Sequence, residues 1–83
     1  MDQILVKLYV PAIEKIYDVW IPAHKRVYEV TSLLIKAVNE MSNCIYKATE
    51  TPMLYDKLTA EAYDVNQFVK DTGVRNGAEI VLI

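Results

Sequence analysis

The feature that most constrains the fold is the apolar run Ile80–Ile83, which ends the sequence. Such a run is too apolar to stay in water, so it is expected to form a strand buried in a sheet. Just before it, Arg75, Asn76 and Gly77 suit a tight turn, because Asn-Gly tolerates positive backbone angles. A strand with neighbours on both sides can be apolar throughout, so this segment is predicted at the sheet centre.

Two more strands are predicted at the start of the sequence. In QILVKLYV, apolar residues recur at every second position, the period of a strand: Ile4, Val6, Leu8 and Val10. In IYDVWI, the same period separates Tyr17, Val19 and Ile21 from Asp18 and Trp20. Pro11 and a short polar break lie between the two segments, so they are predicted to pair as an antiparallel hairpin.

A single long helix should follow Pro22. Apolar residues then recur at intervals of three and four, as on an amphipathic helix: Val27, Val30, Leu34, Val38 and Met41. We expect the helix to end between Asn43 and Lys47, before Thr51 and Pro52.

The segment after Pro52 predicts smaller elements. MLYDKLT and EAYDV suggest two short strands, and Asp64 or Asn66 can cap a short helical segment that runs to Asp71 and stops at Gly73. A right-handed crossover by the long helix then places the last strand parallel to the first. The order predicts an α+β fold of the β-grasp type, a mixed sheet of four to five strands with one long helix across one face.

Composition limits the chain to one domain, residues 1–83, because so short a chain buries only a modest core. Nine basic and eleven acidic side chains give a net charge of -2, so nucleic acid is not an expected partner. No apolar run approaches about 18 residues and none resembles a secretory leader, so we expect no membrane insertion. The single cysteine, Cys44, cannot form an internal disulfide, and the expected location is the cytoplasm.

The sequence resembles ubiquitin-like proteins, above all the YukD and EsaB type associated with the type VII secretion systems of Gram-positive bacteria. The resemblance is carried by QILVK, by DVWIPAHKRVYEV and by TGVRNGAEIVLI, and it covers most of the chain except Cys44–Pro52. It implies a ubiquitin-like fold and a cytoplasmic accessory or regulatory role in such a system.

The resemblance also bears on conjugation. Ubiquitin is conjugated through a flexible tail that ends in two glycines, whereas here Gly73 and Gly77 both precede the last strand. We therefore expect a non-conjugating interaction module. The alternative class is a ubiquitin-like sulfur carrier or protein modifier, which the lack of a C-terminal diglycine disfavours.

Catalytic and metal chemistry are poorly represented in the sequence. His24 precedes the long helix and Cys44 lies near its far end, some 20 residues on at about 1.5 Å each, so they should be too far apart for a nucleophilic pair. One His and one Cys are also too few for a zinc site. We expect no enzyme activity and no cofactor, and we expect Cys44 to be a small buried apolar residue.

One face of the predicted sheet is a candidate interface. The alternation that buries the inward residues leaves five apolar or aromatic side chains on the opposite face: Leu5, Tyr9, Trp20, Val81 and Ile83. Isolated apolar residues are common on surfaces, and Lys7 and Asp18 would dilute such a patch. The alternative, which we favour, is a contiguous docking surface for a secretion component or for a second copy in a homodimer, since Trp and Tyr often anchor interfaces.

The helix entry is a second candidate site. His24, Lys25 and Arg26 stand where an N-terminal cap is expected, and no Ser, Thr, Asp or Asn precedes the helix. Lys25 and Arg26 could extend into solvent while water caps the helix. Alternatively, free N–H groups and the two cations could accept an acidic partner side chain or an anion.

Overall fold

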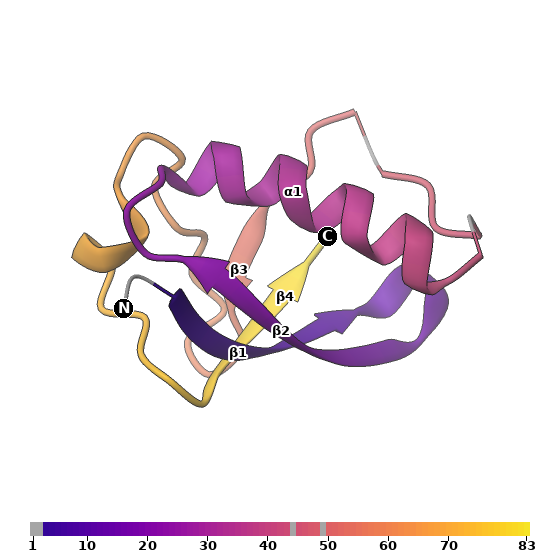
Figure 1. The fold of residues 1–83 in the computed structure, drawn as a ribbon, viewed down its shortest axis with the longest axis horizontal. Helices are drawn as coiled ribbons and strands as arrows, with labels where there is room; N and C mark the ends of the chain where they lie inside the picture. Colours follow the sequence, from indigo (N-terminus) through magenta and orange to yellow (C-terminus); the bar gives the residue numbers. More distant parts are fainter. Residues whose placement is uncertain (1–2, 44, 49) are drawn as a thin grey trace.

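The fold was described from a computed structural model, which covers residues 3–43, 45–48 and 50–83. Its elements follow in this order along the chain: β1 Gln3–Val10, the 3-10 turn η1 Pro11–Ile13, β2 Lys15–Pro22, α1 Val27–Met41, β3 Leu54–Asp56, the 3-10 turn η2 Val69–Asp71 and β4 Ala78–Leu82. Figure 1 shows the sheet with α1 lying across one of its faces.

The sheet has the predicted mixed topology. Its strand order is β2-β1-β4-β3, with β1 antiparallel to β2, parallel to β4, and β3 antiparallel to β4. The last strand therefore lies between two neighbours, as its apolar run predicts. Of the two short strands expected after Pro52, β3 forms, while the second is reduced to a single bridge between Tyr55 and Ala62.

The core lies between α1 and the sheet. The helix contributes a buried stripe at the predicted spacing, Val27, Val30, Leu34 and Val38. The strands contribute buried side chains from their inner faces: Val6, Leu8, Val10, Ile21, Leu54, Ile80 and Leu82. Met41, expected at the end of the stripe, is 45% exposed. This layer is what makes the opposite face of the sheet the open one.

The helix ends earlier than the sequence indicates. Its last residue is Met41, whereas the predicted end lies between Asn43 and Lys47. Ser42 closes the helix with an N–H to the carbonyl of Val38, and Asn43 takes a left-handed conformation with φ of 57°. Asn adopts that conformation more readily than most residues, so it ends the helix in the way a C-terminal glycine would. Cys44, expected to be buried, lies outside the described residues.

The turn before β4 sets the position of that strand. Gly77 has a φ of 88°, and its N–H donates to the carbonyl of Leu5 over 2.8 Å. The N–H of Leu5 in turn donates to the side-chain oxygen of Asn76 over 2.9 Å. These two bonds join the start of β4 to β1, so the Asn-Gly pair fixes both the turn and the parallel pairing.

The segment before this turn is mostly irregular. The expected helical stretch from Asp64 or Asn66 to Asp71 is reduced to η2, and the Asp64 carboxylate instead accepts the N–H of Asn66 in a local turn. No helix in the described part of the chain has both the length and the apolar character needed to cross a membrane.

Candidate protein-binding surface

The face of the sheet that points away from α1, here called the outer face, carries all five predicted interface residues. Strand pairing shows which side chains share it, because residues directly opposite each other point to the same side. Leu5 lies opposite Trp20, and Tyr9 lies opposite both Ile16 and Val81. Val81 also lies opposite Tyr55 in β3, and Ile83 follows two residues later on the same side.

A row of charged residues divides this face. Lys7 lies opposite Asp18 on one side and Glu79 on the other. The Lys7 ammonium is 3.5 Å from the Asp18 carboxylate, and both side chains are largely exposed. Such a pair adds little stability in water, but it keeps this row polar. The expectation of one contiguous apolar surface is therefore wrong along the strands: Leu5 with Trp20 lies on one side of the row, and the other three residues lie on the other.

The first group is small and open. The Trp20 side chain is 60% exposed, and its cross-strand neighbour Leu5 is half-buried. An indole is a large apolar surface to leave in water, and Trp is enriched among residues that anchor interfaces. The position of Trp20 on the open face leaves it accessible to a partner.

The second group is larger than predicted. Besides Tyr9, Val81 and Ile83, it includes Ile16, which is 56% exposed, and Tyr55, which is half-buried. The sequence carried a signal for Ile16, since it lies two residues before Asp18 in the same alternating strand. Tyr55 could be assigned to this face only after β3 was found to pair with β4.

Tyr9 is fixed in place within this group. Its hydroxyl donates to the Glu79 carboxylate over 2.7 Å, and the Lys57 ammonium lies 4.8 Å from the centre of its ring. The hydrogen bond to Glu79, followed by burial and the nearby negative charge, raises the pKa of Tyr9 above its ordinary value. Tyr9 therefore presents a neutral phenol ring in a defined orientation.

The helix entry differs from its prediction. The backbone N–H groups expected to be free at this entry are hydrogen-bonded. The N–H of Val27 donates to the carbonyl of Gln67 over 2.9 Å, and the N–H of Tyr28 donates to the carbonyl of Val65 over 3.0 Å. The Arg26 N–H donates to the Glu29 side chain over 3.1 Å. The expectation of free N–H groups is therefore wrong, because a loop some forty residues further along supplies the cap.

The three basic residues at this entry do not act alike. The Arg26 guanidinium donates to the carbonyl of Asn66 and lies 4.4 Å from the centre of the Phe68 ring, so it serves the fold. Lys25 is half-buried and His24 is exposed. Binding of an acidic partner by these residues stays a prediction, and it now depends on the cations alone.

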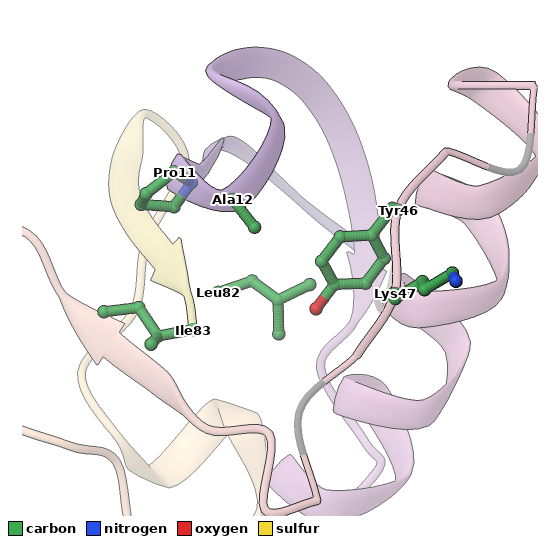
Figure 2. Close-up of a pocket in the computed structure, with 6 residues that line it drawn as sticks. All are labelled: Pro11, Ala12, Tyr46, Lys47, Leu82 and Ile83. Atoms are coloured by element: carbon green, nitrogen blue, oxygen red, sulfur yellow. The ribbon is translucent and has the colours of Figure 1, made fainter.

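An apolar pocket lies at the carboxyl end of β4, and it shares Ile83 with the predicted interface. Figure 2 shows its lining, with the Tyr46 ring directed toward Leu82. Its six lining residues are Pro11, Ala12, Tyr46, Lys47, Leu82 and Ile83, and its volume is about 60 Å³. Ligand sites are typically about 300 Å³ or larger with several polar groups, so this pocket suits at most one apolar side chain.

The pocket has few groups that could take part in catalysis or bind a metal ion. Tyr46 is buried, and burial raises the pKa of its phenol, so the hydroxyl stays neutral near pH 7. Across the described ranges, no three His, Cys, Asp or Glu side chains gather in a way that could hold a metal ion.

No protein-family model and no curated protein matches this sequence, whereas solved structures match its fold. A chain of the "MycP5-free ESX-5 inner membrane complex, State II" matches with a TM-score of 0.86 and 17% identity, covering 100% of this chain and 21% of that chain. The EccD5 ubiquitin-like domain from Mycobacterium xenopi matches with a TM-score of 0.84 and 17% identity, covering 100% of this chain and 94% of the other. The chain has a ubiquitin-like fold.

A third match is to the ubiquitin-like domain of the Mycobacterium tuberculosis type VII secretion system protein ECCD1. Its TM-score is 0.80 at 14% identity, and the match covers 100% of this chain and 99% of that chain. This chain therefore has the length of an isolated ubiquitin-like domain, and it spans 21% of the chain in the ESX-5 complex.

Proposed function

We propose that this chain is a non-conjugating ubiquitin-like interaction module of the YukD and EsaB type, an accessory or regulatory component of a type VII secretion system. The observation that carries the proposal is the full-length match to the ubiquitin-like domains of EccD5 and ECCD1, the second of which is a type VII secretion system protein. The ESX-5 match is to a chain of an inner membrane complex. The partner proposed here is accordingly another component of such a complex, bound from the cytoplasm.

The outer face is the surface proposed to make this contact. It offers two groups of apolar side chains with a charged row between them, and Trp20 and Ile16 are both more than half exposed. Interfaces combine buried aromatic anchors with polar surroundings, and this arrangement supplies both. Binding through fixed side chains needs no catalytic group, so the proposed role is non-enzymatic.

The last four residues of the sequence are held in the sheet. Ile80 and Leu82 are buried in the central strand, and Ile83 exchanges two backbone hydrogen bonds with Met53, at 2.8 and 3.1 Å.

Cross-linking and purification from the native host tests the proposal. The chain is tagged, and the proteins cross-linked to it are compared with those of the double variant Trp20→Ala, Ile16→Ser, which removes one exposed apolar side chain from each group. Type VII components should be recovered several-fold less with this variant. The matched control, Tyr28→Ala with Leu33→Ser, changes two side chains of similar exposure on α1 and should behave like the parent.

Two results would contradict the proposal. One is equal recovery with the outer-face and control variants, or no recovery of secretion components with the parent. The other is a covalent adduct of this chain, seen by intact mass measurement after incubation with host lysate.

A further inference from the structure

The two edges of the sheet differ in the pairing of their backbone groups. At the β3 edge, the Asp56 N–H donates to the carbonyl of Glu61 over 2.9 Å, and the Leu54 carbonyl accepts the Tyr63 N–H over 3.0 Å. A following segment of the chain therefore covers that edge. The opposite edge is β2, whose neighbour in the sheet is β1. Its free backbone groups are those that point away from β1.

The register of β1 shows which backbone groups of β2 point outward. The Leu5 carbonyl accepts the Gly77 N–H, so the backbone groups of Leu5 face β4. Backbone direction alternates along a strand, so the backbone groups of Val6 face β2, and those of its partner Val19 face β1. The residues of β2 whose N–H and carbonyl groups point away from β1 are therefore Ile16, Asp18 and Trp20. Within residues 3–43, 45–48 and 50–83, these three form no backbone hydrogen bond outside strand pairing.

The middle of β2 lacks the features that usually protect an edge strand. Such strands are commonly short, bulged, or protected by lysine or proline. The eight residues of β2 pair with β1 without interruption, and Lys15 and Pro22 stand only at its two ends. Between these ends, Ile16 and Trp20 are both more than half exposed. The centre of β2 is therefore open to backbone pairing with another strand.

The charged residue at this edge of the outer face is Asp18. It begins a row that crosses all four strands with alternating sign, in the order Asp18, Lys7, Glu79 and Lys57. Lys57 belongs to this row because its N–H donates to the carbonyl of Glu79 over 3.1 Å. Opposite charges directly across two strands stabilise their pairing, and like charges destabilise it. The Asp18 side chain is 70% exposed, so a cation in an added strand could lie opposite it and continue the alternation.

A second copy of the chain suits this edge less well. If two β2 strands paired antiparallel around Asp18, the two Asp18 carboxylates would lie directly opposite each other, which destabilises a strand pair. Moving the register by two residues would place Asp18 opposite Ile16 or Trp20 and leave it without a cation. The favoured occupant is therefore a strand of a different protein.

We propose that the free edge of β2 binds an extended segment of a partner protein as an added strand. The segment pairs with the backbone groups of Ile16, Asp18 and Trp20, and it carries a lysine or arginine opposite Asp18. Apolar side chains two positions before and after that cation lie opposite Ile16 and Trp20, on the outer face. The inference rests on the proposed function, because it assumes that the chain docks a protein. It goes further by giving the binding mode and the sequence pattern of the partner.

Peptide selection followed by amide hydrogen exchange, measured by NMR, tests this inference on the complete chain. Peptides selected from a displayed random library should be enriched in a basic residue with apolar residues two positions away on each side. In the free chain, the N–H of Val19 should be protected from exchange, and the N–H groups of Ile16, Asp18 and Trp20 should exchange readily. A selected peptide at about ten times its Kd should slow the exchange of these three groups about tenfold.

Variants at Asp18 separate the contribution of its charge from that of its backbone. Asp18→Ala keeps the N–H, so it should weaken peptide binding by up to about fivefold, the range of a cross-strand ion pair. This effect should shrink at high salt, because exposed charges are screened. Asp18→Pro also removes the outward N–H, which an edge strand tolerates, so it should abolish binding. Glu40→Ala, which removes an exposed acid from α1, is the control.

N-methylated peptides test the backbone pairing without any change to the protein. Methylation of the alternate peptide N–H groups that face β2 should abolish binding, because each of them donates to a carbonyl of the β2 edge. Methylation of the N–H groups between them should leave binding nearly unchanged. Equal effects of the two sets would contradict strand addition.

Other outcomes would also overturn the inference. These are a selection that yields no binders, binders without basic enrichment, and bound peptides that leave the exchange of the three outward N–H groups unchanged. Protection of these groups that grows with the concentration of the free chain would mean that a second copy occupies the edge. If strand addition fails while secretion components are still recovered through the outer face, the proposed function stands. If peptides add to β2 and no secretion component is recovered, only the proposed function fails.

Discussion

The inner face of the sheet, under α1, is a continuous apolar layer, whereas the outer face alternates apolar and charged rows along the strands. The same two-residue period generates both faces. A charge such as Lys7 placed beneath α1 would lose its hydration without a partner, so the covered part of that face carries apolar side chains, and the charges on the same side, Lys15 and Asp56, lie at its edge strands. On the outer face, charged side chains stay hydrated and are therefore tolerated. That face is therefore free to be divided, and its composition can serve binding.

The largest effect expected from this difference is on stability. Leu34 is 4% exposed on α1 and Leu33 beside it is 46% exposed, so the pair compares the two environments with one residue type. Leu34→Ala should lower the free energy of unfolding by about 2 to 5 kcal/mol, through lost burial and the cavity left behind. Leu33→Ala should change it by no more than about 0.5 kcal/mol. Denaturant titration measures both, and similar losses would show that α1 does not cover the core as described.

A smaller loss is expected from the turn that sets the register between β1 and β4. Gly77 has a φ of 88°, and a Cβ at that position would meet no atom within 4 Å, so the cost of Gly77→Ala is conformational. It should be about 1 to 2 kcal/mol, the penalty of a left-handed conformation for an ordinary residue. Gly77→Asn should cost less, because Asn tolerates this region. If denaturant titration gives equal losses of unfolding free energy for the two variants, the cost does not come from the left-handed conformation.

The pKa values of two tyrosines allow the two faces of the sheet to be compared. The pKa of Tyr63, packed against the core, is raised to about 12, first by burial and then by the charge and hydrogen bond of Asp56. The pKa of Tyr9, on the outer face, is also raised, but first by its hydrogen bond to Glu79. Glu79→Gln should therefore bring the pKa of Tyr9 back toward its ordinary value, whereas Asp56→Asn should leave that of Tyr63 clearly raised.

The direction of the pH effect follows from these raised values. The folded state holds both phenol protons more tightly than the unfolded chain, so this stabilisation is complete below about pH 10, the ordinary tyrosine value. It is lost as the pH rises through the folded pKa, about 12 for Tyr63. Tyrosinate absorbance, assigned with the variants, measures the two titrations. A Tyr63 that titrates normally in Asp56→Asn would show that its pKa depends on charge rather than burial.

The smallest effect on stability is expected at the most exposed aromatic residue of the outer face. Trp20→Ala should change the free energy of unfolding by no more than about 0.5 kcal/mol, because the side chain is 60% exposed. As the only tryptophan in the sequence, Trp20 also reports on its own environment. Its fluorescence should be readily quenched by iodide in the free domain. Protection from quenching without a partner would indicate that copies of the chain already cover this face.

The sequence by itself determined the positions of β1, β2, β4 and the start of α1, and which of their faces is buried. Alternation predicted Val6, Leu8 and Val10 as inward, and the spacing of three and four predicted the helix stripe. The apolar run of the last strand indicated its central place in the sheet. These features can be predicted because a strand buries every second residue and a helix buries residues three and four apart. Each spacing of apolar residues is therefore typical of one kind of element.

Only the tertiary structure decided how the outer face is assembled. Lys7 lies beside Glu79, and Tyr9 beside Val81, through a parallel pairing of segments some seventy residues apart, so the charged row could not be placed before the register was known. The helix entry was misjudged for the same reason, because the carbonyls of Val65 and Gln67 that cap it come from a distant loop. Local propensity acts between neighbours in the chain, whereas surfaces and caps depend on the lateral fit of distant segments, which is set only when the whole domain packs.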